Sequence, residues 1–228
     1  MKHIVILEEA SLETVPKRFW GEESCRKVQE RFGVAPEAQI LDDNHHSKIV
    51  RRLAQHEKRG RPDIVHFALL DITSTPAYQT ELVQPILHTI NNKSIFLKGR
   101  VRLPRTLERF NGVMSKVLRN KMDRDEQRLF SLEKEQSISN LIESLQPSRT
   151  ICMSTEGILK KLPDILTARE NEDNSPTLWM VGGFARGHFS EDAKRVADEI
   201  ISISKFSLPA HVVTSRISYE IEESRELS

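Results

Sequence analysis

The stretch Val101-Arg102-Leu103-Pro104-Arg105-Thr106-Leu107-Glu108-Arg109-Phe110 places three arginines where a helix is expected to begin. Pro104 suits the first helical position, because its fixed φ and its missing N–H cost nothing there. On an ideal helix Arg105, Arg109 and Lys116 fall within roughly 40° of one another. The apolar residues of this helix cluster on the other side, about 135° away: Leu107, Phe110, Val113, Met114, Val117 and Leu118. The pattern predicts a helix with one core face and one cationic face.

The cationic face can be interpreted in two ways, as a solvated charged surface or as a contact to phosphate. Glu108 is the only acid near the three arginines, so local neutralisation is poor. Arginine forms planar, bidentate contacts to phosphate that lysine cannot form. The use of arginine at all three positions favours a nucleic-acid contact, although the solvated face stays open as the alternative.

Composition limits the classes of protein to consider. The 228 residues are 38% hydrophobic and 29% charged, which is typical of a globular protein with a substantial core. The 34 basic and 33 acidic side chains leave a net charge of +1, so any nucleic-acid site must be a local patch. Cys25 and Cys152 have no CxxC spacing, so we expect reduced cysteines and no zinc site. We expect neither a signal peptide nor a membrane span.

Apolar periodicity predicts strands alternating with helices. Buried strands are expected at residues 4–7, 63–70, 151–153 and 178–181, and a hairpin at 86–90 and 94–97. Helices are expected near residues 47–56, 138–145, 158–167, 190–201 and 210–221. This order predicts an α/β fold with a mainly parallel sheet in a single domain, residues 1–228. The highly charged region around residues 119–148 is expected to be an inserted peripheral lobe.

A glycine-rich loop, Trp179-Met-Val-Gly-Gly-Phe-Ala-Arg-Gly187, follows a predicted strand and precedes a helix. Glycines there allow the backbone to approach a ligand closely. The spacing departs from GxGxxG and lacks the Gly-Lys-Ser/Thr of a P-loop, so neither a Rossmann nor an NTPase site is indicated. A tight turn without a ligand is the alternative. Residues 201–206 are expected to connect the last two helices.

Arg61-Pro62-Asp63 opens the second predicted strand. An aspartate two residues from an arginine can orient its guanidinium, although aspartate at a strand edge is also an ordinary turn residue. We interpret His66 as a core histidine. His45 and His46 have no partner at metal spacing, and there is no GxSxG elbow around Ser154.

Together these pieces resemble a known family. Arg61-Pro62-Asp63 ahead of Leu69-Leu70-Asp71, the arginine stretch 101–110, Gly-Gly-Phe-Ala-Arg-Gly at 182–187 and Ser-Lys-Phe-Ser-Leu-Pro-Ala at 204–210 resemble the ribosome-biogenesis pseudouridine N1-methyltransferases of the SPOUT class. The resemblance implies an α/β domain with a C-terminal trefoil knot, which forms a homodimer. It also implies that S-adenosyl-L-methionine lies among three loops of the knot. The implied reaction is methylation of N1 of a pseudouridine in small-subunit rRNA.

The resemblance also assigns roles to residues. Arg61 would contact RNA, and Asp63 would hold the Arg61 side chain in place. Arg102, Arg105 and Arg109 would also bind the RNA. The cofactor would be held by the following residues: Met153, Ser154, Gly182, Gly187, Ile201, Ser202, Ile203, Ser204, Lys205 and Phe206. The chain departs from the family at residues 72–75, Ile-Thr-Ser-Thr where Ser-Pro and Asn-Lys are favoured, and at Lys205-Phe206, where Asn-Tyr is common. No histidine or cysteine stands out as a general base.

Partners and alternatives follow from the same resemblance. The expected partners are an rRNA hairpin, a second copy of the chain through Val212, Val213, Ile217 and Ile221, and ribosomal or assembly proteins. The expected location is the cytoplasm of an archaeal-like cell, or the nucleolus if the host is eukaryotic. A non-enzymatic RNA-binding assembly factor is the alternative function, and a SPOUT enzyme for another RNA base is a weaker one.

Overall fold

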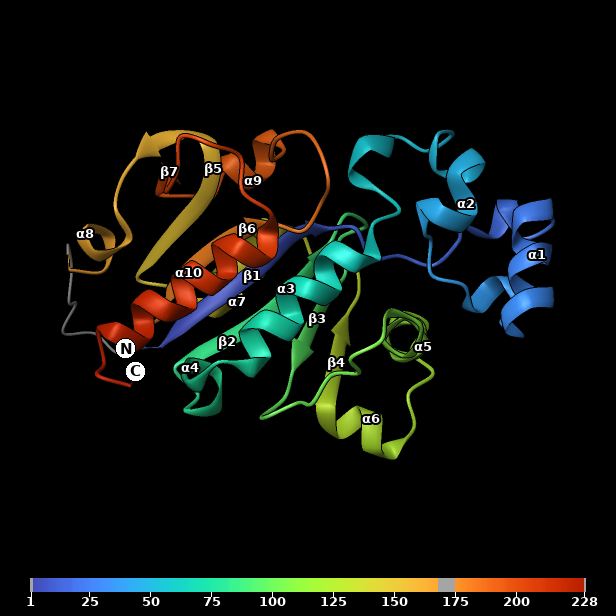
Figure 1. Ribbon diagram of the computed structural model, residues 1–228, viewed down its shortest axis with the longest axis horizontal. Coiled ribbons are helices and arrows are strands. Elements are labelled where there is room, and N and C mark those ends of the chain that lie inside the picture. The colour runs from blue at the N-terminus through green and yellow to red at the C-terminus, as the bar shows by residue number, and fades with distance from the viewer. Residues whose placement is uncertain (1, 168–174, 228) are drawn as a thin grey trace.

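The computed structural model describes residues 2–167 and 175–227, and its centre is a seven-stranded sheet in the order β4-β3-β2-β1-β6-β5-β7 (Figure 1). The strands are β1 His3–Ala10, β2 Val83–Thr89, β3 Ser94–Leu97, β4 Phe130–Glu133, β5 Arg149–Leu159, β6 Thr177–Gly182 and β7 Glu199–Ser202. The α-helices are α1 Glu23–Phe32, α2 Asp43–Val50, α3 Pro62–Ser74, α4 Pro76–Gln79, α5 Leu107–Leu118, α6 Arg124–Leu129, α7 Ile138–Leu145, α8 Leu162–Thr167, α9 Glu191–Arg195 and α10 Ala210–Glu223. Short 3-10 turns are η1 Lys17–Phe19, η2 Pro36–Ala38 and η3 His56–Lys58.

Most of the sheet is parallel. β1 pairs in parallel with β2 and β6, and β5 pairs in parallel with β6 and β7. β3 and β4 complete one edge in antiparallel register, and β2 with β3 forms the predicted hairpin. Parallel sheets are covered on both faces, which explains why every residue of β1 is buried. The predicted mixed α/β fold with a mainly parallel sheet is confirmed; the trefoil knot stays a prediction.

The two faces of the sheet carry separate cores because successive side chains of a strand point to opposite sides. Val5 and Leu7 of β1 belong to the larger core, which packs under α3, α5 and α10. Ile4 and Ile6 belong to a smaller core with α7 and α9. In Figure 1, α3 and α10 run side by side over one face of the sheet.

A lobe between β1 and α3 projects from one end of the sheet (Figure 1). It contains α1 and α2 and has its own apolar cluster: Val15, Phe19, Cys25, Leu41, Ile49, Val50 and Leu53. The charge pattern of the sequence predicted a lobe around residues 119–148 instead. That segment supplies edge strand β4, and Ile138 and Leu141 of α7 are buried in the smaller core. Its charged side chains lie mainly on the exposed surfaces of α6 and the neighbouring turns, while the segment itself is part of the central sheet and the core.

The strand predicted at residues 63–70 is wrong, because these residues lie in α3. The helix packs against the sheet and α10, so apolar residues occupy most of its circumference and the period of a surface helix is lost. Pro62 in the first turn, followed by Asp63, is a typical helix start. That local signal outweighs an apolar run, which strands and buried helices share.

The helix of the arginine stretch begins later than predicted. Thr106 is the N-terminal cap and Leu107 the first residue of α5, so Pro104 and Arg105 precede the helix. Phe110, Met114, Val117 and Leu118 are buried as expected. Lys116 pairs with Glu126 at 2.7 Å. The proposed row of Arg105, Arg109 and Lys116 on one helical face is therefore not present.

The C-terminal third differs from expectation at one strand. Ser190 caps α9 as predicted, but α9 ends at Arg195 and residues 199–202 form β7 rather than the end of a helix. α10 matches its prediction closely. Ile217 and Ile221 of α10 are buried in the chain's own core, so they cannot contribute to the intersubunit stripe expected from the sequence, whereas Val212 and Val213 are half-buried.

Candidate functional site

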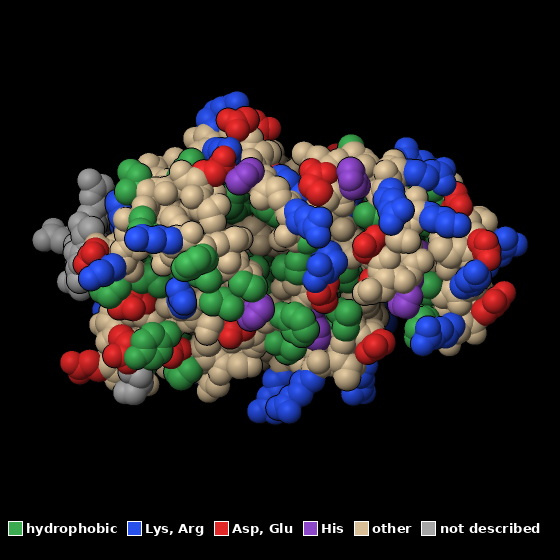
Figure 2. All heavy atoms as spheres, turned by 45° about the horizontal axis from the view of Figure 1, so that its top comes forward, with side chains coloured by type: hydrophobic (Ala, Val, Ile, Leu, Met, Phe, Trp, Pro, Cys, Tyr) green, Lys and Arg blue, Asp and Glu red, His purple; other side chains and the backbone are tan. Residues whose placement is uncertain are grey.

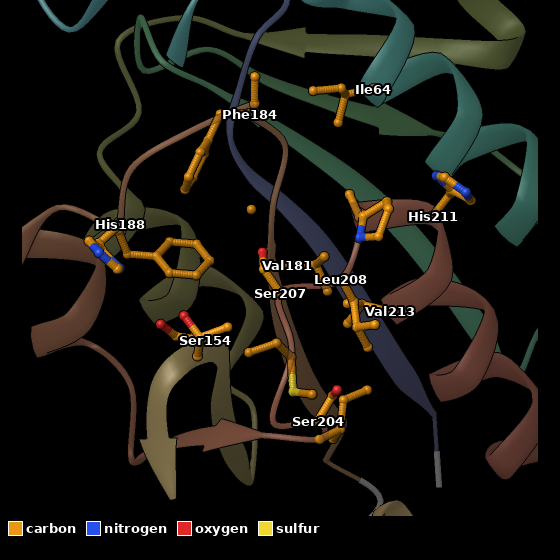
Figure 3. A pocket seen from close by; sticks show the side chains of 18 of the residues that line it. Ile64, Ser154, Val181, Phe184, His188, Ser204, Ser207, Leu208, His211 and Val213 are labelled. Carbon is orange, nitrogen blue, oxygen red and sulfur yellow. The ribbon is translucent and has the colours of Figure 1, made fainter. Parts of the chain in front are cut away.

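A cavity of about 560 Å³ opens where the parallel strands β5, β6 and β7 reach their carboxyl ends. Ligands of open α/β sheets bind outside these strand ends, and ligand pockets commonly enclose about 300–1,000 Å³. Its walls bring together residues from α3, α10 and the loops after the three strands: Arg61, Asp63, Ile64, Phe67, Met153, Ser154, Thr155, Val181, Gly182, Phe184, Ala185, Gly187, His188, Phe189, Ile201, Ser202, Ile203, Ser204, Phe206, Ser207, Leu208, Pro209, Ala210, His211 and Val213. Figure 3 shows Phe184, Ser154, Ser204 and Leu208 around this space.

The glycine loop after β6 forms one wall of the cavity. A Cβ at Gly183 would lie 2.8 Å from Cα of Ala10, so the loop can pack on the end of β1 only with glycine there. A Cβ at Gly182 would meet the Phe184 ring at 2.9 Å. Gly187 has φ +94°, a conformation that residues with a side chain rarely adopt. The loop is therefore a shaped part of the wall rather than an ordinary turn.

β5 and β7 form the opposite wall. Their pairing shifts register between Met153 and Ile158, and the shift brings Ser154 to the cavity. The Ser202 hydroxyl donates to the carbonyl oxygen of Ser204 at 2.7 Å, which fixes the turn after β7. Of the cofactor residues expected from the sequence, Lys205 alone does not line the cavity.

Apolar and aromatic side chains cover much of the cavity. The Phe184 and Phe189 rings meet edge to face, with centroids 5.6 Å apart and an interplanar angle of 81°. Val181 and Leu208 add aliphatic surface. Hydroxyl groups, the side chains of His188 and His211, the Arg61–Asp63 pair and the backbone of the loops supply the polar positions. This composition suits a ligand with a flat ring and a polar tail.

Arg61 and Asp63 lie together at the rim. The Arg61 Nε donates to Oδ1 of Asp63 at 2.8 Å, and Nη2 donates to Oδ2 at 2.7 Å. Burial by itself raises the pKa of Asp63, but the hydrogen bonds and charge of Arg61 outweigh it and hold that pKa below its ordinary value. The Arg61 side chain stays 43% exposed, so its outer edge can reach a ligand.

Arg102, Arg105 and Arg109 are exposed and do not line the cavity. Within residues 2–167 and 175–227, none of them forms an ion pair or a side-chain hydrogen bond with another residue. Their segment is nevertheless anchored to α3. The carbonyl oxygen of Pro104 accepts a hydrogen bond from Nε2 of His66 at 2.7 Å, and the His66 ring stacks on Phe110. His66 is a buried core histidine, as predicted.

Several lining residues were missed by sequence reasoning. Phe184 stands inside the quoted glycine motif, and an aromatic residue between such glycines could have indicated a pocket wall. Phe67 was missed because residues 63–70 were expected as a strand. His211, which meets Phe67 edge to face, lies in the helix predicted at residues 210–221, but no motif singled it out. His46 is buried and bonded to Gln39, and no group of three metal-ligand side chains occurs among the described residues.

Comparison with known proteins places this geometry in a family. The model of the family described as EMG1/NEP1 methyltransferase matches residues 5–222, nearly the whole chain. The chain belongs to this family. Among its relatives, the ribosomal RNA small subunit methyltransferase Nep1 of Staphylothermus marinus is 31% identical over 214 residues, which cover 93% of this chain and 92% of the relative. The protein with the same name from Sulfurisphaera tokodaii is 32% identical over 225 residues, with 95% of each chain covered.

A solved structure supports the same placement. Archaeoglobus fulgidus Nep1 bound to S-adenosylhomocysteine superposes with a TM-score of 0.84 and 28% identity, and the match covers 99% of this chain and 100% of that chain. The likeness therefore includes the lobe, the sheet and the C-terminal loops. Over the described ranges, no helix is long and apolar enough to span a membrane.

Proposed function

We propose that this protein is an S-adenosyl-L-methionine-dependent methyltransferase acting on N1 of a pseudouridine in small-subunit rRNA during ribosome assembly. The observation that carries the proposal is the cavity at the ends of β5, β6 and β7, walled by the glycine loop and the turn after β7. Its position in a chain that superposes over its full length on an S-adenosylhomocysteine complex supports the cofactor assignment. The names of the relatives support the rRNA substrate.

The residues present fit the cofactor. The Phe184 and Phe189 rings and Leu208 offer apolar surface for an adenine ring, and the constrained backbone at Gly182 and Gly187 brings main-chain groups to the cavity. Met153, Ser154 and the backbone of residues 201–206 would hold the rest of the molecule. When bound, S-adenosyl-L-methionine supplies the electrophilic methyl group.

The protein's own contribution is to position the two reactants. Arg61 at the rim, held by Asp63, would contact a phosphate of an RNA whose target base enters the cavity. Such a base must be unstacked, as in a hairpin loop. Arg102, Arg105 and Arg109, which are exposed outside the cavity, would add further contacts to phosphates of the RNA. Asp63 is a weak base because its pKa is lowered, so we assign it the role of orienting Arg61 rather than of removing the N1 proton.

A homodimer belongs to the proposal. With Ile217 and Ile221 buried and Val212 and Val213 half-buried, the most exposed aromatic side chains available for a subunit contact lie elsewhere on the α3–α10 pair. Phe67 is 53% exposed and Tyr219 is 57% exposed. On the face shown in Figure 2, hydrophobic side chains gather left of centre, and Lys and Arg side chains are more frequent on the right. A hollow lies between these two regions. An interface through Phe67 would bring a second copy close to the cavity, which that residue also lines.

Relatives from archaea favour the cytoplasm as the site of action, with rRNA and ribosomal or assembly proteins as partners. The alternative, an RNA-binding assembly factor without enzymatic activity, predicts a cavity that does not bind the cofactor. Isothermal titration of the protein with S-adenosyl-L-methionine separates the two. We expect one saturable site per chain; absence of binding at millimolar cofactor would contradict the enzyme and favour the assembly factor.

A further inference from the structure

The end of β1 contains a distortion that aims an acidic side chain toward the glycine loop. Glu9 has φ +50°, and the pairing of β1 with β2 shifts register between Leu7 and Ala10. A bulge of this kind re-aims a side chain, and a non-glycine residue with positive φ is costly. Its persistence indicates that contacts of Glu9 hold the backbone in place.

Glu9 makes two such contacts. Its Oε2 lies 2.6 Å from Nζ of Lys58, which belongs to η3 in the lobe. Its Oε1 accepts a hydrogen bond from the backbone N–H of Ser190 at 3.0 Å. The side chains of Lys58 and Glu9 are only 6% and 10% exposed. The carboxylate therefore connects the lobe to the residue where the glycine loop ends and α9 begins.

Lys58 also touches the loop. Its Nζ lies 4.8 Å from the centroid of the Phe184 ring, in the range of a cation–π contact. Its Cε lies 3.5 Å from where a Cβ of Gly187 would be. The start of the loop is fixed independently, since Gly183 donates its N–H to the carbonyl of Glu8 and accepts from Ser11. Lys58 and Glu9 thus hold the middle and the end of the loop.

We propose that the buried Glu9–Lys58 pair positions the cofactor loop, by holding Phe184 against the cavity and Ser190 at the loop's end. The inference rests on the proposed binding of S-adenosyl-L-methionine in this cavity. Neither residue lines the cavity, so both act through Phe184 and the loop backbone. The lobe is then a structural part of the cofactor site.

A purely stabilising ion pair is the competing explanation, and the chain supplies a matched control. Arg59 follows Lys58 and pairs with Glu13 at 2.7 Å, with side chains 12% and 5% exposed. The side-chain hydrogen bonds of that pair go to Asn91 and to the carbonyl of Ala54, and none goes to the glycine loop. The Arg59–Glu13 pair is buried to a similar degree and lies in the same lobe. Removing this pair therefore shows the effect of general destabilisation alone.

The experiment compares Lys58→Met, Glu9→Gln and the double variant with Arg59→Met. Three quantities are measured: the thermal midpoint, the dissociation constant of S-adenosyl-L-methionine by titration calorimetry, and amide hydrogen exchange of residues 183–190 without cofactor. The double variant leaves no unpaired buried charge, so it guards against variants that fail to fold. Lys58→Arg tests rescue, because it keeps a cation able to reach Glu9 and Phe184.

We expect the Lys58 and Glu9 variants to weaken cofactor binding roughly tenfold, about 1.4 kcal/mol, and to speed exchange in residues 183–190. Arg59→Met should lower the thermal midpoint without either effect, and Lys58→Arg should restore part of the affinity. Unchanged affinity and exchange in the folded Lys58 and Glu9 variants would overturn the positioning role, as would equal losses in Arg59→Met. Failure of the wild-type protein to bind the cofactor would instead contradict the proposed function.

Discussion

Arg61 and Asp63 form a two-point ion pair at the rim of the cavity, with Nε–Oδ1 and Nη2–Oδ2 distances of 2.8 and 2.7 Å. Because both nitrogens on one edge of the guanidinium are occupied, the orientation of the group is fixed, and its side chain stays 43% exposed. Asp63 lies in the first turn of α3, where a carboxylate also interacts favourably with the helix dipole. The pair places one oriented cation next to the proposed entrance for the target base.

Replacing Asp63 by Ala should weaken RNA binding as much as replacing Arg61 by Ala. Removing a charge-assisted hydrogen bond costs about 1.5–3 kcal/mol, and an unanchored guanidinium no longer presents its donors in a fixed direction. Filter binding of a pseudouridine hairpin measures the change. The double variant, with both residues replaced by Ala, should bind the hairpin as tightly as Arg61→Ala does. A further loss of RNA affinity in the double variant would mean that Asp63 acts independently of Arg61.

The pair also has a pH dependence with a definite sign. The folded-state pKa of Asp63 lies below its ordinary value of 3.8, so the stabilisation is fully present above that value and is lost as pH falls through the lowered folded pKa. Asp63→Asn should remove this contribution. Urea unfolding at several pH values should show the difference between wild type and Asp63→Asn shrinking only in strongly acidic solution, and a constant difference would contradict the assignment.

Arg102→Ala, Arg105→Ala and Arg109→Ala should each reduce hairpin affinity without changing the affinity for S-adenosyl-L-methionine. The three side chains are exposed and do not line the cavity, so their expected partners are phosphates. The slope of log affinity against log salt should become shallower by about 0.7–0.9 for each phosphate that a variant no longer neutralises. Arg128→Ala is the control, since Arg128 is exposed on α6 and pairs only with Asp125 in the described structure. An unchanged slope in all three variants would assign these arginines to a solvated surface.

Gly187→Val should weaken cofactor binding at least tenfold, because a β-branched residue disfavours φ +94° and the loop would have to change its path. Gly182→Val should act through Phe184, whose ring a Cβ would meet at 2.9 Å. Gly21→Val is the matched control, since no atom lies within 4 Å of a Cβ at Gly21. Calorimetry with S-adenosyl-L-methionine compares the two loop variants with the control. Wild-type affinity for the cofactor in either loop variant would mean that the loop does not form part of the cofactor site.

Light scattering should give a mass near twice that of the 26.2 kDa chain, and Tyr219→Asp should shift it toward the monomer. A charge on the exposed side of α10 would be buried without a partner in the proposed interface. Phe32→Asp, at another exposed aromatic residue on α1, should leave the dimer intact. A monomeric wild-type protein at micromolar concentration would contradict the dimer, and loss of the dimer in both variants would indicate a non-specific effect.

Short sequence motifs predicted the residues of the cavity more accurately than apolar periodicity predicted the helices and strands around it. The glycine loop, Ser154 and residues 201–204 meet at one cavity although they are far apart in sequence, and the resemblance to a family identified them. α3 was mistaken for a strand because a helix covered on several sides lacks a polar face. β7 was missed because its four residues follow α9 without a turn signal. The Lys58–Glu9 contact joins residues 49 positions apart, and no local sequence pattern predicts such a pair.

Mass spectrometry of an RNA hairpin after incubation with the protein and isotopically labelled S-adenosyl-L-methionine tests the central claim most directly. The paired substrates are one hairpin with a pseudouridine in its loop and the same hairpin with uridine, whose N1 is bonded to the ribose. We predict one labelled methyl group on the pseudouridine base, located at N1 by fragmentation, and none on the uridine hairpin. No transfer to a pseudouridine hairpin that the protein binds together with the cofactor, or equal transfer to both hairpins, would contradict the account.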